Sequence, residues 1–425
     1  MNVLVVGSGG REHAIVWALK QSPKVTELYC APGNAGTAMI AQNIPIKAED
    51  IYGLEKFAQT NRIDLTVVGS EAPLVKGIVD LFEERGLTIF GPSKAAARLE
   101  GSKMFLKHFL KRHNIPTASY ETFNQSGFEK AKEYISSNNG PFVIKTDGLA
   151  AGKGVAICPT REEADRTLRE YFEVKIFGEA GSNVVIEEFM EGEEASVFAM
   201  CDGEGYVLLS SAQDHKRIGD GDTGKNTGGM GAYAPAPIVT PQVLEKIENE
   251  IIRPTLRGMK AEGYPYKGCL YVGLMIKDGI PKVVEFNVRL GDPETQVVMP
   301  LIRSDVFDLF DGCAKGKIAE YRLQLKDSSA VVVVLASKGY PDVFQTGKEI
   351  SGLENVSDDT IVFHAGTKNE NGKVLSTGGR VLGVTSLGSD LNAAIRNVYT
   401  GIPRIQFENN YYRTDIGKKG LIRTQ

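Results

Sequence analysis

The chain has 425 residues, enough for about three domains and a sizeable apolar core. Hydrophobic residues make up 42% and charged residues 24%, and 49 basic against 53 acidic residues give a net charge of −4, which argues against a nucleic-acid partner. No apolar run has the length of a membrane helix, and the N-terminus begins as a strand rather than a signal peptide, so no membrane association is expected.

The cysteines and histidines carry little sign of metal or disulfide chemistry. Five cysteines lie far apart without a CxxC pair, and no two of the five histidines have the spacing of metal ligands. This pattern argues against a disulfide scaffold, a zinc ribbon and a zinc hydrolase. We expect free thiols and a cytoplasmic location.

The first hundred residues alternate between strands and helices, as in an open parallel α/β sheet. Glycine-containing turns lie at the strand ends, where sheets of this kind bind ligands. The expected strands are Asn2–Val6, Glu27–Cys30, Asp64–Val68 and Leu87–Phe90, and the expected helices are Arg11–Gln21 and Pro73–Arg85.

A helical connector, Ser93–His113, leads into a compact α+β block that we expect to form a small mobile lid. The residue before Pro116 is disfavoured in a helix, which ends the connector there. The expected elements of the block are the strand Phe142–Lys145, the helix Arg161–Phe172 and the strand Asn183–Glu187.

Strands, a long polar loop and a helix follow the lid. Thr240 is expected to cap the helix, and Asp278-Gly279 to form the turn of a hairpin. The expected elements are strands near Ala195–Met200 and Gly205–Ser210, the loop Asp214–Thr227, a helix to about Glu262, and hairpin strands Leu270–Lys277 and Lys282–Val288. A separate, mostly β domain is expected from Ala330. The expected domains are therefore residues 1–102, residues 103–328 with the lid at about 120–190, and residues 329–425.

Two glycine loops follow the first two strands. In Gly7–Glu12, backbone amides at the positive end of the next helix can bind a phosphate. The third glycine of the dinucleotide fingerprint is replaced by Glu12, which argues against a dehydrogenase. Pro32–Gly36 has the same character. Two such loops at one sheet edge favour a phosphate or phosphosugar site, although either alone is equally consistent with a plain strand–helix turn.

The segment Lys145–Gly154 resembles a phosphate loop but departs from the Walker pattern, because three residues separate Gly148 from Gly152 and Gly154 stands where Ser or Thr would hold magnesium. A glycine flap over ATP phosphates, with Lys145 neutralising their charge, fits better. A surface hairpin with solvated lysines is the alternative.

Carboxylates gather in two further segments. Glu187–Glu194 is either a solvated acidic face or a hinge that binds an adenosine. In Val284–Leu290, period-two alternation places Glu285, Asn287 and Arg289 on one face of a strand. An acid and an amide are hard oxygen ligands for Mg²⁺, and the guanidinium binds anions. An ordinary half-exposed strand is the alternative.

Together, these segments resemble the glycinamide ribonucleotide synthetase (phosphoribosylamine–glycine ligase) family of ATP-grasp enzymes almost from end to end. The resemblance is carried by GSGGREHA, APGNAGTA, GSEAPLVKG, LEGSKMF, KTDGLAAGKGV, EEFMEGEEAS, QDHKRIGDGDTGKNTGGMGAYAPAP, EFNVRLGDPETQ, HAGT and GGRVLGVT. It implies an α/β multidomain, ATP-grasp fold with an N-terminal open parallel α/β domain, a mobile lid and a C-terminal mostly β domain. It also implies a monomer or weak homo-oligomer.

The resemblance implies that glycine, 5-phosphoribosylamine and ATP give glycinamide ribonucleotide, ADP and phosphate through a glycyl phosphate, in de novo purine biosynthesis. It implies Mg²⁺ or Mn²⁺ on Glu285 and Asn287. Arg289 is the candidate for the glycine carboxylate or the transferred phosphoryl group, and Asp214 and Asp292 are candidates for positioning the two amines. ATP would be held by Lys103, Lys145, Gly152, Lys153, Gly154, Glu187, Phe189 and Glu194, and phosphoribosylamine by Gly9, Gly10, Arg11, Glu12, Gly33, Asn34 and Glu71.

Three positions depart from the family's motifs. Ser70 and Lys225 stand where proline is usual, which is expected to loosen two loops, and Leu290 stands where phenylalanine is common. There are two alternatives to the ligase: another ATP-grasp carboxylate–amine ligase, and an inactive nucleotide-binding regulatory module. The segments from Gln213 and Gly291 argue against the first, and the presence of both metal ligands and both lysines argues against the second.

Overall fold

The computed structural model describes residues 1–148, 154–174, 176, 182–357 and 359–423, so the flap positions Gly152 and Lys153 lie outside the described residues. The N-terminal region is a five-stranded parallel sheet of order β3-β2-β1-β4-β5, as the alternating pattern predicts. Its strands are β1 (Asn2–Gly7), β2 (Glu27–Pro32), β3 (Gln42–Asn43), β4 (Leu65–Val68) and β5 (Ile89–Phe90).

The helices of this region differ from the sequence-based expectation at two places: Ile51–Thr60 is a helix that was not expected, and the expected helix Pro73–Arg85 breaks at Gly77. Gly77 has φ +96°, a left-handed conformation that only glycine adopts without strain, and its N–H donates to Pro73 O at 3.1 Å. The expected single helix Pro73–Arg85 is therefore wrong, because the chain ends one helix here and begins another. The helices are α1 (Gly10–Lys20), α2 (Ile51–Thr60), α3 (Glu71–Lys76) and α4 (Ile78–Glu84).

The connector after this sheet also divides in two, at Ser102. The Ser102 hydroxyl accepts a hydrogen bond from Phe105 N at 3.1 Å and so caps the second helix. The two helices are α5 (Arg98–Gly101) and α6 (Lys103–Arg112). The cap sets Lys103 at the first position of α6, where its side chain faces the neighbouring lid.

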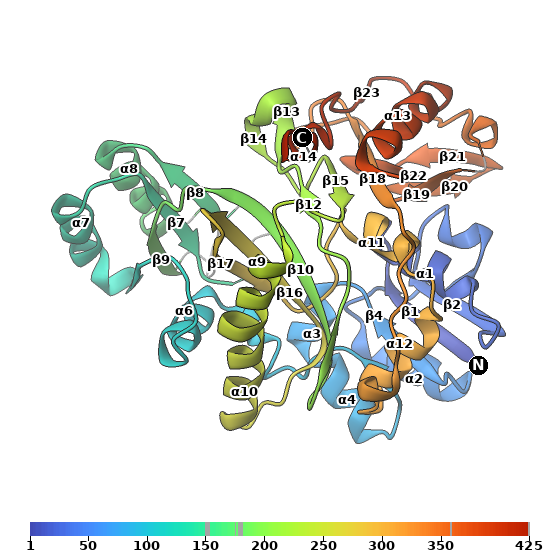
Figure 1. The fold of residues 1–425 in the computed structure, drawn as a ribbon, viewed down its shortest axis with the longest axis horizontal. Coiled ribbons are helices and arrows are strands. Elements are labelled where there is room, and N and C mark those ends of the chain that lie inside the picture. Colours follow the sequence, from blue (N-terminus) through green and yellow to red (C-terminus); the bar gives the residue numbers. More distant parts are fainter. Residues whose placement is uncertain (149–153, 175, 177–181, 358, 424–425) are drawn as a thin grey trace.

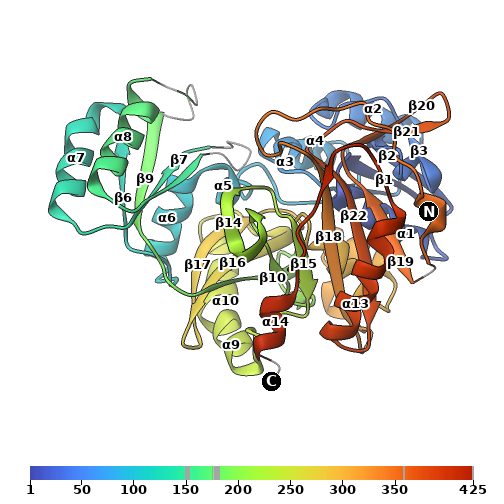
Figure 2. The ribbon, with the colours of Figure 1, turned by 90° about the horizontal axis from the view of Figure 1, so that it is seen from above.

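The expected lid is a separate lobe at one end of the molecule (Figures 1 and 2). It is an antiparallel sheet of order β6-β9-β7-β8, with two helices packed on a small apolar core of their own. Its elements are β6 (Tyr120–Asn124), α7 (Phe128–Ser137), β7 (Phe142–Thr146), β8 (Val155–Cys158), α8 (Arg161–Phe172) and β9 (Asn183–Glu188).

A second antiparallel sheet, β11-β10-β16-β17, forms the middle of the molecule. Asp278 and Gly279 have φ +52° and +72°, the hairpin turn that the sequence predicts. Thr240 caps the following helix by accepting from Val243 N at 3.3 Å. The strands are β10 (Glu193–Asp202), β11 (Tyr206–Leu208), β16 (Lys267–Lys277) and β17 (Ile280–Asn287), and the helix consists of α9 (Pro241–Lys246), a π-helical stretch (Ile247–Ile252) and α10 (Arg253–Ala261).

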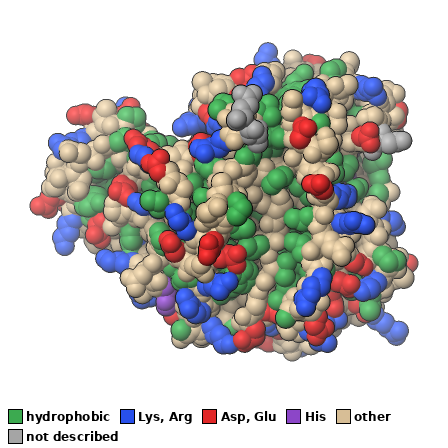
Figure 3. Space-filling model, in the orientation of Figure 1, with side chains coloured by type: hydrophobic (Ala, Val, Ile, Leu, Met, Phe, Trp, Pro, Cys, Tyr) green, Lys and Arg blue, Asp and Glu red, His purple; other side chains and the backbone are tan. Residues whose placement is uncertain are grey.

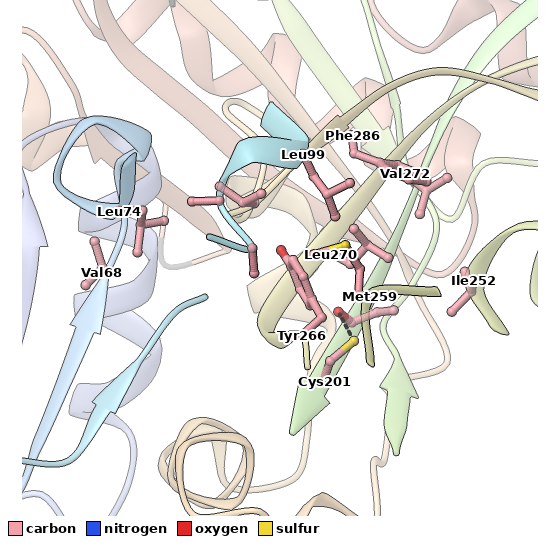
Figure 4. Close-up of a cluster of buried hydrophobic side chains, with 14 of the residues drawn as sticks. Val68, Leu74, Leu99, Cys201, Ile252, Met259, Tyr266, Leu270, Val272 and Phe286 are labelled. Carbon is pink, nitrogen blue, oxygen red and sulfur yellow. Dashed lines mark hydrogen bonds between the residues drawn. The ribbon is translucent and has the colours of Figure 1, made fainter. Parts of the chain in front are cut away.

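One apolar cluster joins the N-terminal sheet to the middle sheet (Figure 4). Val68 and Leu74 contribute from the first, and Leu270 and Val272 from β16. Burial of apolar surface on this scale is the main favourable contribution to folding. The cluster therefore packs the two sheets against each other. The lid lies beside them and has an apolar cluster of its own.

The C-terminal region is built around the sheet β12-β15-β18-β22-β19, to which β23 adds at β18. Gly231–Ala234 pairs with Ala330–Val333, so this sheet takes strands from both sides of the expected boundary at residue 329. The remaining elements are β12 (Gln213–Asp214), β15 (Gly231–Ala234), α11 (Thr295–Leu301), α12 (Val306–Ala314), β18 (Ser329–Ser337), β19 (Thr360–His364), β20 (Thr367–Glu370), β21 (Lys373–Ser376), β22 (Arg380–Gly388), α13 (Leu391–Gly401), β23 (Asn410–Tyr411) and α14 (Lys418–Arg423).

The long polar loop expected at Asp214–Thr227 contains a hairpin, β13 (Arg217–Gly219) paired with β14 (Thr223–Asn226). Its glycines and charged residues hide the strand pattern in the sequence. Charged side chains of both signs are interspersed over the face shown in Figure 3. Among the described residues, no helix is both long and apolar enough to cross a membrane.

Candidate active site

Two lysines surround the carboxylate of Glu187 where the lid meets α6. Lys145 on β7 places Nζ 2.9 Å from Oε1, and Lys107 on α6 places Nζ 2.9 Å from Oε2. All three side chains are buried. Burial lowers the pKa of Lys107 to about 8, against the raising effect of Glu187. Lys107 was missed by the sequence analysis, although its spacing of four from Lys103 on a helix could have indicated it.

Lys103 begins α6 and points at the flap. Its Nζ donates to Gly148 O at 3.1 Å. Burial lowers its pKa, only partly offset by Glu285. Lys145 also donates to Val284 O at 3.3 Å, and Gly154, at the other end of the flap, accepts at its carbonyl from the N–H of Thr146 at 2.8 Å. The two ends of the flap are thus adjacent, and two lysines stand at its base.

Glu285 and Asn287 lie on one face of β17, as the alternation predicts. Asn287 Nδ2 is 3.5 Å from Glu285 Oε1. Burial acts to raise the pKa of Glu285, but Lys216, Lys145 and Lys103 outweigh it, so the pKa lies below its ordinary value. Glu285 is therefore ionised at neutral pH and offers an oxygen ligand beside three cations.

Lys216, which the sequence analysis left unassigned, lies among these carboxylates. Its Nζ is 2.7 Å from Glu194 Oε2. Burial raises the pKa of the neighbouring Asp214 to about 8, with Lys216 opposing and Glu285 among the groups that add to the shift. Asp214 ends the strand β12 and is followed by the buried His215.

Arg289 is held by two carboxylates from distant parts of the chain. Its Nη2 lies 2.9 Å from Glu100 Oε1 and its Nε lies 3.3 Å from Glu71 Oε2. Arg11 Nη1 is 3.9 Å from the same Glu71 oxygen, and Arg11 Nε also pairs with Glu12. Burial raises the pKa of Glu100. Glu100 was not among the expected residues. It lies 189 positions before Arg289 in the sequence, so no local motif could have paired the two.

A cavity of about 350 Å³ lies between the two glycine loops and the C-terminal region. Asp292 lines it and is 3.0 Å from Arg380, which the sequence analysis also left unassigned. Burial acts to raise the pKa of Asp292, but Arg380 and Arg11 outweigh it and leave the pKa below its ordinary value. The cavity is lined by Ser8, Gly9, Pro32, Gly33, Asn34, Asp292, Tyr340, Ala365, Gly366, Thr367, Thr377 and Arg380.

The glycine loops make their own contacts around this cavity. Asn34 Nδ2 donates to Ser8 O at 2.9 Å and to His364 O at 2.8 Å, which joins the two loops to the C-terminal region. The N–H of Gly9 donates to Glu12, and a Cβ at Gly10 would lie 2.5 Å from Gln296. Gly10 therefore serves close packing and does not line the cavity.

The three departures from the family's motifs occupy ordinary positions. The hydroxyl of Ser70 is buried before α3 and has no hydrogen-bond partner among the residues that the structure describes, and Leu290 is buried. Lys225 lies 2.8 Å from Asp342, an exposed pair that ties β14 to the C-terminal region.

The described residues thus form three adjoining groups. The first, beside the lid, consists of Lys103, Lys145, Glu187, Glu194, Asp214, Glu285 and Asn287; the second of Arg11, Glu12, Glu71 and Arg289; the third lines the cavity and includes Gly9, Gly33, Asn34 and Asp292. Phe189 follows β9 with 40% of its surface exposed. Cations and carboxylates placed at one cleft can bind and polarise a phosphate group.

Models of one protein family match most of the chain. The N domain of phosphoribosylglycinamide synthetase matches residues 1–100, its ATP-grasp (A) domain residues 101–295 and its C domain residues 330–419. This agrees with the fold class that the motifs predict. The expected ATP-grasp architecture is confirmed.

Curated relatives and a solved structure agree with this match. The phosphoribosylamine–glycine ligase of Chlorobaculum tepidum is 51% identical over 99% of this chain and 100% of its own length, and that of Vibrio vulnificus is 50% identical over 100% of both. The crystal structure of phosphoribosylamine–glycine ligase from Thermotoga maritima superposes with a TM-score of 0.86 at 37% identity, covering 98% of this chain and 100% of that one. The chain therefore belongs to the phosphoribosylglycinamide synthetase family.

Proposed function

We propose that the chain ligates glycine to 5-phosphoribosylamine at the expense of ATP, giving glycinamide ribonucleotide, ADP and phosphate in de novo purine biosynthesis. The observation that carries this proposal is the cluster in which Lys103 and Lys145 lie near Glu285, whose pKa they lower, with Asn287 beside Glu285 on the same strand. It is supported by the shared name of relatives that match this chain over their full length.

The reaction has two balanced steps. A glycine carboxylate oxygen attacks the γ-phosphorus of ATP, the bond to the β-phosphate oxygen breaks, and ADP leaves with its electron pair. The amine of phosphoribosylamine then attacks the carbonyl carbon of glycyl phosphate, phosphate leaves, and the nitrogen loses a proton. Because the protein forms no covalent bond, it acts by positioning and by neutralising charge.

The nucleotide is proposed to lie between the lid and the middle sheet. Lys103 and Lys145 neutralise the phosphates, the flap Gly152-Lys153-Gly154 covers them, and Glu187, Phe189 and Glu194 line the adenosine slot. Two further residues join this set on their geometry: Lys107, because it holds Glu187, and Lys216, because it lies between Glu194 and Glu285.

Glu285 and Asn287 are proposed to hold Mg²⁺ or Mn²⁺ when ATP is bound. The fit is supported by an ionised carboxylate and an amide on one strand face, both hard oxygen donors. Among the described residues, no group of three or more His, Cys, Asp or Glu side chains is arranged to hold a metal, so the ATP phosphates would complete the ligand set. The bound ion would neutralise phosphate charge during transfer.

The remaining residues are proposed to bind the other two substrates. Arg289 is assigned to the glycine carboxylate or the transferred phosphoryl group, and Asp214 and Asp292 to the amines. The phosphoribosyl group is assigned to the cavity, where Arg380 adds a cation at the wall. The residues assigned to this substrate are Gly9, Gly33 and Asn34, which line the cavity, and Gly10, Arg11, Glu12 and Glu71, which do not.

The chain is further proposed to act in the cytoplasm as a monomer or weak homo-oligomer. Its five cysteines are all buried and free, which suits a reducing compartment.

The test is ADP release from ATP, Mg²⁺ and glycine, with and without phosphoribosylamine generated in the cuvette. ADP formation that requires both substrates, with glycinamide ribonucleotide identified by mass, supports the proposal. ATP binding without turnover by either substrate would overturn it and leave a nucleotide-binding module, and turnover with another amine would indicate a different ATP-grasp ligase.

A further inference from the structure

The C-terminal residues 411–419 lie along the hairpin β13–β14, and both views show this hairpin near α14 (Figures 1 and 2). The centre of this contact is Arg413, whose side chain is fully buried. Its Nη1 donates to Arg217 O at 3.0 Å and to Asp222 Oδ1 at 2.9 Å, while Nη2 and Nε donate to Asp415 at 2.7 Å. One guanidinium therefore joins the start of the hairpin to its tip.

Further hydrogen bonds extend the contact on both sides of Arg413. Thr414 N donates to Asp220 Oδ1 at 2.9 Å, and Tyr411 OH donates to Ile218 O at 2.9 Å. Gly221 N donates to a carboxylate oxygen of the C-terminal segment at 2.8 Å. The segment thus holds both the backbone and the side chains of the hairpin.

The hairpin has little of its own to hold it in place. Its two strands share only two aligned pairs, Arg217 with Asn226 and Gly219 with Thr223, with an irregularity between them. All four residues of β14 are exposed. A short two-stranded hairpin without a buried face is marginally stable. The C-terminal segment therefore supplies many of the contacts that position the hairpin, alongside the pair of Lys225 with Asp342.

The position of the hairpin matters because Lys216 immediately precedes it. Lys216 O accepts hydrogen bonds from Thr227 N at 2.7 Å and from Thr227 Oγ1 at 2.8 Å, so the lysine backbone is part of the hairpin base. Its ammonium reaches Glu194 at 2.7 Å in the cleft. On the other side, the ring of His215 is buried against Tyr233, which anchors the strand before it.

We infer that Arg413 is a positioning residue for the ligation reaction: by holding the carbonyl of Arg217 it fixes the backbone of Lys216 and so aims the lysine ammonium at the nucleotide cleft. This inference rests on the proposed function of that cleft. Arg413 is not among the residues proposed to bind substrate or nucleotide, and its inferred action is through Lys216.

The chemistry of the contact requires arginine. A guanidinium presents five donors in a fixed plane, which here serve a backbone carbonyl and two carboxylates at once. The ammonium of a lysine is a single point and does not reach Arg217 O, Asp222 and Asp415 together. Arg413→Lys therefore keeps the charge but releases part of the hairpin.

The experiment is a double-mutant cycle in the full chain, with Arg413→Lys, Lys216→Met and the two combined. ATP dissociation constants and kcat are measured for each. Arg413→Lys is expected to lower kcat between about tenfold and a hundredfold, since small misplacements of a positioned group have effects of this size. In the Lys216→Met background, the same change is expected to cost less than about twofold. Arg396→Met, on the exposed face of α13, is the matched control.

Equal fold-losses in both backgrounds would overturn the inference and leave Arg413 a stabilising residue only. If Arg413→Lys does not fold, as judged by circular dichroism and thermal unfolding, Asp222→Asn in both backgrounds takes its place, because it loosens the same contact at the partly exposed tip. Because the ATP dissociation constant is measured as well as turnover, failure of the inference can be distinguished from failure of the proposed function. A wild-type chain that binds ATP without ligating refutes the function, whereas additive effects on ATP binding refute the role of Arg413.

Discussion

The ammonium of Lys216 lies 2.7 Å from Oε2 of Glu194, in the space between the lid and the middle sheet. This carboxylate is one of those proposed to line the adenosine slot, and in the structure it is paired with a lysine. Glu194, Asp214 and Glu285 are three acidic groups around one cation. Lys216 therefore supplies a positive charge to these carboxylates, in addition to Lys103 and Lys145 near Glu285.

Lys216→Met is expected to weaken ATP binding and to lower kcat/KM by about tenfold to a hundredfold, because one charge-assisted contact is worth about 1.5–3 kcal/mol. Steady-state kinetics and titration calorimetry with ATP check this. Lys260→Met removes an exposed lysine that pairs with Glu204 and is expected to change neither quantity. An unaltered ATP affinity in the Lys216 variant would contradict the assignment.

Glu285→Gln is expected to abolish ligation, with a loss of at least about a hundredfold in kcat, while the fold stays intact. The amide retains the shape but removes the charge that a divalent ion requires. The measurement is turnover against Mg²⁺ concentration, together with the thermal unfolding midpoint. Glu245→Gln, an exposed position on α9, is the control. Normal turnover in a well-folded Glu285 variant would remove this residue from the metal site.

Lys107→Met is expected to lower the free energy of unfolding by about 3 kcal/mol, because it leaves the buried Glu187 with one cation instead of two. It is also expected to raise the KM for ATP, since Glu187 would draw Lys145 away from the phosphates. Thermal unfolding and ATP kinetics measure the two effects. Lys111→Met, one turn further along α6 and exposed, serves for comparison, and equal behaviour of the two variants would refute the prediction.

Arg380→Met is expected to raise the KM for phosphoribosylamine by about tenfold or more and to leave the ATP dissociation constant unchanged. Arg380 lines the cavity between the glycine loops and the C-terminal region and pairs with Asp292 at 3.0 Å, away from the lid. Arg322→Met, at an exposed guanidinium, is the control. If the ATP dissociation constant rises and the KM for phosphoribosylamine does not, the phosphoribosyl group binds elsewhere.

Stability is expected to fall with acid partly through His215. Burial lowers the pKa of His215 from 6.5 to about 4, so between these values the unfolded chain binds a proton that the folded chain does not. The free energy of unfolding therefore decreases as the pH falls from about 6.5 to about 4, by about 3 kcal/mol for this group. His215→Phe should reduce the pH dependence of denaturant unfolding over this range. His108→Phe, at an exposed position, should not; equal slopes for both would contradict the prediction.

Elements with strong local patterns could be predicted from the sequence. The alternation of Val284–Leu290 predicts the strand that carries Glu285 and Asn287. Thr240 predicts the start of the helix that follows it in the sequence. The break at Gly77 and the hairpin β13–β14 could not be predicted, because glycine is equally common in turns, strands and helix ends.

The missed site residues share another cause. Glu100 meets Arg289 and Arg380 meets Asp292 only because the chain folds back over long separations, and no local period records such contacts. Lys107 differs: it lies four residues after Lys103 on an expected helix, so the spacing indicated that both lysines share a face.

The pairing of Gly231–Ala234 with Ala330–Val333 has a consequence for anyone who divides this chain into pieces. If the chain were cut at residue 329, the C-terminal fragment would expose the edge of β18 that pairs with β15. The N-terminal fragment would expose the matching edge of β15, and unpaired edges of this kind promote aggregation. We therefore expect the last hundred residues to be less stable as a separate fragment than in the whole chain. A smaller enzyme made by truncation would lose the cavity wall along with the strand order that holds it.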